Sequence, residues 1–370
     1  MINLIGGIEF CKLYFAAITF SILFGAFKPM SRAKKGVYLF IFFSFLAFLT
    51  GFRAPSIGND TATYLEHFKN IASYNTPFRY INRNGMEPGY VIYCWLLSRI
   101  SREPQILLIV TSAIVYISTG SFVYKYTERP GLFCCLFIGI MQFDFFMSIM
   151  RQALALAIIL FSFNYIVKQK PIRFLIVCLL AVTFHYSSIL FILTYPLVRN
   201  KRRENKNSFS YFLPLIATLI ASMFFSNVIN GVLTIFPKYT YYLGSKSFDG
   251  VPRLALILKI AVYALLFFVP KLLSHHKSAN EQNEEIYDRL SYINICILVL
   301  AMNAVILDRF GSTFSMFATL HYSNQVAAME KADKVIITCL TLIAFAFYGF
   351  IIILYRTPEW VTTYPIELFF

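Results

Sequence analysis

Charged residues are scarce in this 370-residue chain: only 14% are Asp, Glu, Lys or Arg, whereas 58% are hydrophobic. The mean hydropathy is accordingly high, at +0.65. An ordinary soluble domain carries about 25% charged residues, which cover its surface with polar groups. The shortage therefore excludes a water-soluble globule and indicates a protein that crosses a lipid bilayer several times.

The motifs of metal and nucleotide chemistry are absent as well. The sequence contains no D-x-D, G-x-x-x-x-G-K-[ST], G-x-S-x-G or H-E-x-x-H. Its seven cysteines lie in apolar surroundings without C-x-x-C spacing or a paired histidine, so we interpret them as small core residues. We expect no metal site and no cofactor, which leaves a metal-free reaction on a lipid-linked anionic substrate.

Basic residues, by contrast, are plentiful, and the net charge is +15. Such an excess could indicate a nucleic-acid partner. However, the Lys and Arg residues form short clusters between apolar runs, which is the pattern that orients membrane helices. We therefore expect the lipid bilayer as a partner and no nucleic acid.

Apolar runs of about 20 residues, the length that crosses the hydrocarbon core, predict ten membrane-spanning helices. They lie at residues 8–27, 36–52, 104–124, 131–149, 152–167, 208–228, 252–270, 290–307, 310–326 and 335–355. The first lacks a charged leader and a small-residue cleavage site, so we expect it to be retained. Placing the basic connections in the cytoplasm puts both chain ends outside.

This arrangement predicts an all-α, polytopic helical bundle with residues 1–370 in a single membrane domain. Outer loops are expected at 53–103 and 229–251, and a polar cytoplasmic loop at 271–289. Residues 87–101 are too few to span comfortably and predict an amphipathic or re-entrant helix on the outer side.

The apolar stretch 172–198 does not fit a simple count, because basic clusters, KQKPIR and RNKRRENK, flank both of its ends. It must cross an even number of times, yet it is too short for two full helices. A re-entrant hairpin with its turn near TFHYSS (183–188) satisfies both conditions and raises the helix count to 11 or 12. The alternative is one long tilted helix.

Arginine predominates among the basic residues that are left on the outer side. A guanidinium can hold phosphate or carboxylate with two parallel hydrogen bonds, which lysine cannot do. Five arginines lie at predicted outer helix ends: Arg53, Arg151, Arg253, Arg309 and Arg356. Together they would form an anion site. Alternatively, Arg53 and Arg356 snorkel at helix ends, and Arg151 pairs with Asp144, two helical turns earlier.

Other polar residues are candidates for proton transfer or sugar binding. His185 lies at the predicted hairpin turn and can exchange a proton near neutral pH, although a satisfied core histidine is the simpler interpretation. Asp60 and Glu87 lie in the glycine-containing loops IGNDTATY and NGMEPGY. Tyr241 and Tyr242, in FPKYTYYLG, suit a sugar-stacking surface or an interfacial aromatic belt equally well.

The order of these motifs resembles that of EpsG-like proteins, a branch of the Wzy-type O-antigen and exopolysaccharide polymerases. The matching residues are Arg53, Gly58-Asn59-Asp60, Tyr64, Glu87-Pro88-Gly89-Tyr90, Arg151-Gln152-Ala153-Leu154-Ala155, Phe184-His185-Tyr186-Ser187-Ser188 and Arg309. The likeness covers most of residues 36–330. Each motif is short, so the ordered set on a membrane scaffold carries the resemblance.

The resemblance implies a multi-pass glycosyltransferase of the bacterial inner (plasma) membrane, which uses no metal and no cofactor. Such polymerases join undecaprenyl-diphosphate-linked oligosaccharide units on the periplasmic face, for O-antigen, capsule or exopolysaccharide. It also implies that Arg53, Arg151 and Arg309 offset the charge of the leaving diphosphate. Asp60, Glu87 or His185 would accept the proton of the acceptor hydroxyl. The other candidate substrate-binding residues are Arg253, Tyr64, Gln152, Tyr241 and Tyr242.

Two other functions share parts of this pattern. A lipid-linked oligosaccharide flippase or other transporter also needs a basic cavity, but usually has more full spans and internal repeats, which we do not find. A membrane acyltransferase that modifies the polysaccharide would favour a catalytic histidine in the cytoplasmic half, whereas His185 is predicted near the outer half. A chain-length regulator and a flippase of the same pathway are the protein partners that the resemblance implies.

Overall fold

A computed structural model describes residues 2–199, 209–225, 253–273, 281–304, 307–357 and 361–370, together with residues 227, 230, 231 and 234. Within these ranges the chain is helical and has no β-strand, only an isolated antiparallel bridge between Arg53 and Leu368. The prediction of an all-α fold is confirmed.

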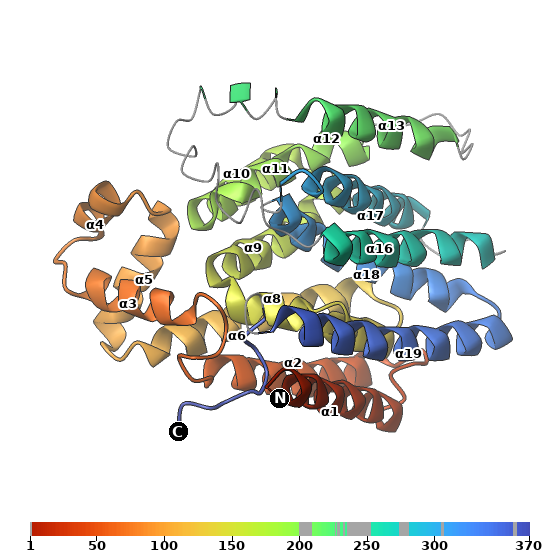
Figure 1. Ribbon diagram of the computed structural model, residues 1–370, viewed down its shortest axis with the longest axis horizontal. Helices are drawn as coiled ribbons and strands as arrows, with labels where there is room; N and C mark the ends of the chain where they lie inside the picture. Colours follow the sequence, from red (N-terminus) through yellow and green to blue (C-terminus); the bar gives the residue numbers. More distant parts are fainter. Residues whose placement is uncertain are drawn as a thin grey trace. The chain divides into compact units, whose positions relative to one another are not determined.

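The chain divides into two compact units, Met1–Tyr195 with Lys331–Phe370, and Pro196–Glu330. The long helices of the first unit are α1 (Ile2–Leu23), α2 (Arg32–Gly51), α6 (Gln105–Tyr126), α9 (Met150–Val167) and α19 (Lys331–Arg356). Helix α2 packs along α6, and α1 packs along α19 (Figure 1). The assignment of all 370 residues to a single domain stays a prediction.

Six helices of the described chain are long and apolar enough to span a membrane: α1, α2, α6, α9, α16 and α19. A seventh span results if α7 (Pro130–Gly139) and α8 (Gln142–Ser148), bent by 56° at their junction, are counted together. The predicted total of ten is not confirmed. Three of the ten predicted spans correspond to helices that are shorter or more polar, namely α13, α17 and α18.

The span predicted at 131–149 is not one unbroken helix, because the helix breaks between α7 and α8. Met141 adopts φ 64°, the left-handed region that side chains other than glycine rarely occupy. A second break follows directly, since the non-helical residue Ile149 separates α8 from α9. Asp144 and Arg151 therefore do not lie on one continuous helix.

The hairpin predicted within residues 172–198 is confirmed, and a single long helix is excluded. The segments are α10 (Pro171–Phe184), η1 (Tyr186–Ser188), α11 (Ile189–Ile192) and α12 (Thr194–Arg199). Extended backbone at His185 ends α10 at the predicted turn. The chain then runs back, because the ring of Tyr195 lies 5.2 Å from that of Phe174 in the first turn of α10.

The predicted outer loop at 53–103 folds into three short helices, α3 (Thr61–Ala72), α4 (Pro77–Asn84) and α5 (Pro88–Ile100) (Figure 1). Proline at the first position of α4 and of α5 favours helix initiation there, since its missing N–H would have no partner in the first turn. Gly85 ends α4 in the left-handed conformation, φ 60°. The predicted helix over 87–101 is confirmed as α5.

The second unit contains α13 (Phe209–Met223), α16 (Arg253–Leu273), α17 (Glu281–Ala301) and α18 (Asp308–Ala328). The prediction of a loop over 271–289 is wrong for residues 271–273, which end α16, and for residues 281–289, which form the first turns of α17. Ion pairs explain why so polar a stretch is helical. Arg289 contacts Glu285 one turn earlier, at 2.5 Å, and Lys271 contacts Asp288. Most of the predicted loop 229–251 lies outside the described residues.

Candidate functional site

Arg151, near the start of α9, joins two of the sequence motifs. Its Nη1 donates to Oε2 of Glu87 at 2.5 Å. Glu87 is only 5% exposed and occupies the N-cap of α5, where the helix dipole favours negative charge. The ion pair therefore fixes the start of α5 against the start of α9.

Two tyrosines surround the Arg151 guanidinium. Its central carbon lies 5.8 Å from the ring centroid of Tyr64 and 5.9 Å from that of Tyr90, within cation–π range. The two rings are 6.0 Å apart, and both side chains are buried. Nε of Arg151 is itself buried and has no hydrogen-bond acceptor among the described residues. Because buried donors are normally paired, Nε is a donor suited to an acceptor that the protein does not supply.

The alternative pairing of Arg151 with Asp144 is wrong. Arg151 pairs with Glu87, and the non-helical Ile149 interrupts the helix on which Asp144 would have faced it. Asp144 is 6% exposed, and its carboxylate lies in the interior of the first unit.

The Gly58-Asn59-Asp60 motif forms a tight turn before α3. Gly58 has φ +86°, and a Cβ there would lie 2.4 Å from the carbonyl oxygen of Met147, so only glycine fits. Asp60 is the N-cap of α3, one helical turn before Tyr64. It is half-buried, and its carboxylate forms no hydrogen bond or ion pair with the part of the chain that is described.

The hairpin turn lies against the start of α5. A Cβ on Gly89 would come within 2.2 Å of Oγ1 of Thr183, so α5 and the end of α10 are in close contact. Nδ1 of His185 accepts the backbone N–H of Ser187 at 3.2 Å, beside the Ser187 hydroxyl at 2.8 Å. Since Nδ1 accepts, the neutral ring carries its proton on Nε2.

Arg53 has a different environment from Arg151, since it is 1% exposed and bonded to the protein itself. Nε donates to Ile57 O and Thr61 Oγ1, each at 3.2 Å, Nη2 donates to Met147 O at 3.0 Å, and Nη1 donates to Thr50 O. Burial lowers the pKa of Arg53 to about 10, so it stays charged at neutral pH. These contacts join the end of α2 to the start of α3 and the end of α8, and they favour a structural role.

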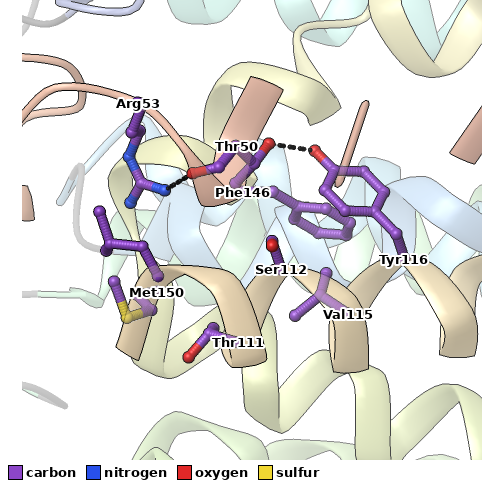
Figure 2. A pocket seen from close by; sticks show the side chains of 9 residues that line it. Thr50, Arg53, Thr111, Ser112, Val115, Tyr116, Phe146 and Met150 are labelled. Atoms are coloured by element: carbon purple, nitrogen blue, oxygen red, sulfur yellow. Dashed lines mark hydrogen bonds between the residues drawn. The ribbon is translucent and has the colours of Figure 1, made fainter. Parts of the chain in front are cut away.

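A small cavity beside Arg53 supports the same conclusion. Figure 2 shows Arg53 and Thr50 at this cavity, with Tyr116 bonded to the Thr50 hydroxyl. It is lined by Thr50, Arg53, Leu108, Thr111, Ser112, Val115, Tyr116, Phe146 and Met150. Its volume of about 10 Å³ holds about one water molecule and is too small for a sugar or a diphosphate.

The structure does not assign the remaining predicted residues to this site. Gln152 is buried beside Arg151 in sequence, with 1% exposure. Arg309 is an exposed residue in the first turn of α18, in the second unit. Arg253 begins α16, but its side chain lies outside the described part, as do Tyr241 and Tyr242 entirely. Their roles in substrate binding stay predictions.

Sequence reasoning missed His67, which lies on α3 one turn after Tyr64. Its Nδ1 is 2.6 Å from the hydroxyl of Tyr80 on α4. Burial, and then the positive charge of Arg151, lower the pKa of His67, while Glu66 opposes the shift. The spacing of Tyr64 and His67 places both on one helix face, and this was the available signal.

No curated protein and no solved structure matches the chain. The family model of the EpsG family matches residues 36–366, which include all the motifs described above. This match covers most of the chain. Together with the several helices that are long and apolar enough to span a membrane, it supports a polymerase-like role in polysaccharide biosynthesis. The protein therefore belongs to the EpsG family.

Proposed function

We propose that this protein joins undecaprenyl-diphosphate-linked oligosaccharide repeat units on the outer face of the bacterial inner membrane. In this reaction a hydroxyl of the acceptor unit attacks the anomeric carbon of the donor. The bond from that carbon to the diphosphate oxygen breaks, undecaprenyl diphosphate leaves, and a base takes the hydroxyl proton. The diphosphate already activates the donor sugar. The protein therefore needs to stabilise the negative charge on the leaving diphosphate and to accept the proton of the hydroxyl.

One observation carries the proposal: Arg151 has a buried Nε that finds no acceptor within the described residues, beside two tyrosine rings and at the meeting point of separate motifs. A diphosphate oxygen would supply the missing acceptor. Glu87 holds the guanidinium in place through Nη1, so no reorganisation is needed when negative charge develops on the leaving group. The rings of Tyr64 and Tyr90 lie close to the guanidinium and limit its movement.

The contacts also rank the three candidate bases. Glu87 already accepts a hydrogen bond from Arg151, and protonating it would remove the charge that balances the guanidinium. His185 accepts at Nδ1 and carries its proton on Nε2, which suits donation to a phosphate oxygen. Asp60 is half-exposed, and its carboxylate forms no bond within the described chain. We therefore assign proton acceptance to Asp60.

The test is a strain that lacks this protein, with its surface polysaccharide separated by size on a gel. Loss of a polymerase leaves single repeat units on the surface. Loss of a flippase or other transporter leaves none, and loss of an acyltransferase leaves chains of normal length. Chains of normal length or an empty surface would contradict the proposal. A chain-length regulator and a flippase of the pathway are the protein partners that we expect.

A further inference from the structure

Residues 361–370 form an extended segment that follows α19 and runs back to the motif-bearing loop of the first unit. We propose that this segment is a positioning element for the site: it holds the Gly58-Asn59-Asp60 turn in place, and through it Asp60 at the start of α3 and Tyr64, which lies beside Arg151. The inference rests on the proposed function only for the role of Asp60, because the contacts themselves do not depend on the reaction.

The end of the segment pairs with the residues that leave α2. The N–H of Ala54 donates to Glu367 O, and the N–H of Phe369 donates to Phe52 O, each at 2.8 Å. These bonds flank the antiparallel bridge of Arg53 with Leu368. The backbone on both sides of the buried Arg53 is therefore tied to the segment.

The beginning of the segment holds the turn itself. The N–H of Gly58 donates to Thr362 O at 3.2 Å, and Oγ1 of Thr362 donates to Oδ1 of Asn59 at 2.9 Å. The same Oδ1 lies 3.5 Å from the hydroxyl of Ser148 at the end of α8. Asn59 is thus held between residues 361–370 on one side and α8 on the other.

The segment can serve as a support because it is anchored in the core. Thr363 is fully buried and Tyr364 is 3% exposed. The Tyr364 ring meets Phe10 of α1 edge-on, with the ring centroids 5.9 Å apart. A Cβ on Gly6 would lie only 3.3 Å from Tyr364 O, so α1 and the segment are closely packed.

The turn determines where α3 begins, since Asp60 is the N-cap of that helix and Tyr64 follows one turn later. Arg53 fixes the other side of the loop through Ile57 and Thr61. Removing the segment would leave the Arg151–Glu87 pair intact but release the Asn59 side of the turn. We therefore expect turnover to fall more than substrate affinity.

Two variants at Thr362 test this in the full-length protein in its own membrane. Thr362→Val removes the donor to Asn59 at nearly constant shape, and Thr362→Ser keeps the hydroxyl. We expect the valine variant to lower kcat about fivefold at similar KM for the cell's own lipid-linked repeat unit, as loss of about one hydrogen bond predicts. The serine variant should restore it. Tyr355→Ala, at an 85% exposed side chain on α19 outside the segment, is the matched control and should change nothing.

A second readout does not depend on the reaction. Ile57 is 5% exposed in the loop that the segment covers, so Ile57→Cys, in a background without the native cysteines, reports loosening through reaction with an impermeant maleimide. Deleting residues 361–370 should accelerate labelling at least tenfold and leave single repeat units. If the deleted protein does not accumulate, the Thr362 pair decides.

The outcomes separate the two proposals. Slow labelling together with long chains after the deletion would overturn the positioning role, as would equal activity of the valine and serine variants. The opposite combination is also informative. If the segment deletion accelerates labelling, but a strain that lacks the whole protein still makes chains of normal length, the positioning role is supported and the polymerase function is overturned.

Discussion

Arg53 and Arg151 are both expected at outer helix ends from sequence, yet their surroundings differ in kind. Arg53 is 1% exposed and donates to three backbone carbonyls and a threonine hydroxyl. The Arg151 side chain is 29% exposed, has one carboxylate partner and keeps a buried Nε without an acceptor in the described chain. The protein satisfies the first arginine itself, and leaves the second incompletely satisfied.

This difference shows what separates a structural arginine from one that serves a ligand. From the sequence the two residues cannot be told apart, because both are arginines expected at the outer end of a membrane helix. The deciding quantity is the number of acceptors that the folded chain brings to the guanidinium, and these are mainly backbone carbonyls from distant segments, such as Met147 for Arg53. The predictions below test this division.

The largest effect on protein level is expected for Arg53→Lys, and the other variants below affect turnover at normal abundance. A single ammonium cannot serve Met147 O and Thr50 O together with Thr61 Oγ1, and each buried carbonyl left without a donor costs about 1–3 kcal/mol. Membrane abundance on a blot should fall about tenfold or more. Arg99→Lys, an exposed arginine stacked 4.7 Å from Trp95, is the control and should accumulate normally. Normal abundance of Arg53→Lys with loss of long chains would instead assign Arg53 to the substrate.

The next effect concerns Asp60, on the Arg151 side of the comparison. Asp60→Asn keeps the shape of the N-cap but cannot accept a proton, so turnover should fall about 10²- to 10⁴-fold at normal abundance. In Glu87→Gln, which only weakens the hold on Arg151, the loss should be smaller, about tenfold. Turnover is measured as repeat units joined per minute in membranes. A larger loss of turnover in Glu87→Gln than in Asp60→Asn would instead assign proton acceptance to Glu87.

Arg151→Lys should insert and accumulate normally while polymer yield falls about 100-fold, as for loss of a preorganised donor. Lysine supplies charge without the planar fork that serves Glu87 and a second acceptor together. Gel length and blot intensity are measured in parallel with Asp144→Asn, which should give long chains at normal abundance. Long chains from Arg151→Lys would remove Arg151 from the reaction.

The smallest effect is on stability at acid pH. Burial and the charge of Arg151 lower the pKa of His67, so between its folded value and the unfolded value of about 6.5 the unfolded chain binds more protons. Stability is therefore full above about pH 6.5 and falls as pH drops through this window.

The measurement is the thermal midpoint of purified protein at pH 7.5 and 5.5. His67→Gln should show a smaller loss between these pH values than the parent. Arg151→Gln should also show a smaller loss, because the depressing charge is gone. Equal losses in all three proteins would show that His67 does not report the charge of Arg151.

Several parts of the fold follow from sequence because one local rule governs them. The turn at His185 is predicted by basic clusters at both ends of a short apolar stretch, and the structure places extended backbone there. The helix over 87–101 is predicted by its length and begins with Pro88 at a favoured position. In both cases the signal lies within the segment itself.

Other parts were missed because they depend on distant contacts. The sequence around Met141 is mostly apolar, and methionine is not a residue that favours left-handed backbone, so nothing local indicates this conformation. Residues 281–289 are polar, yet they form a helix that is supported by an ion pair to Lys271. Pairing Arg151 with Asp144 assumed an unbroken helix, whereas the true partner, Glu87, lies 64 residues away. The motifs identified the segments of the site, but not which residues face one another.

The contact of Gly89 with Thr183 has a consequence for how this sequence can diverge. With Oγ1 of Thr183 2.2 Å from the place of a missing Cβ, position 89 cannot gain a side chain while residue 183 stays as it is. An alanine at 89 becomes tolerable only in a lineage that has already shortened residue 183. The carbonyl oxygen of Thr183 also lies only 2.9 Å from that Cβ position, so a relative with a larger residue at 89 should carry a smaller residue at 183 and a displaced His185 turn.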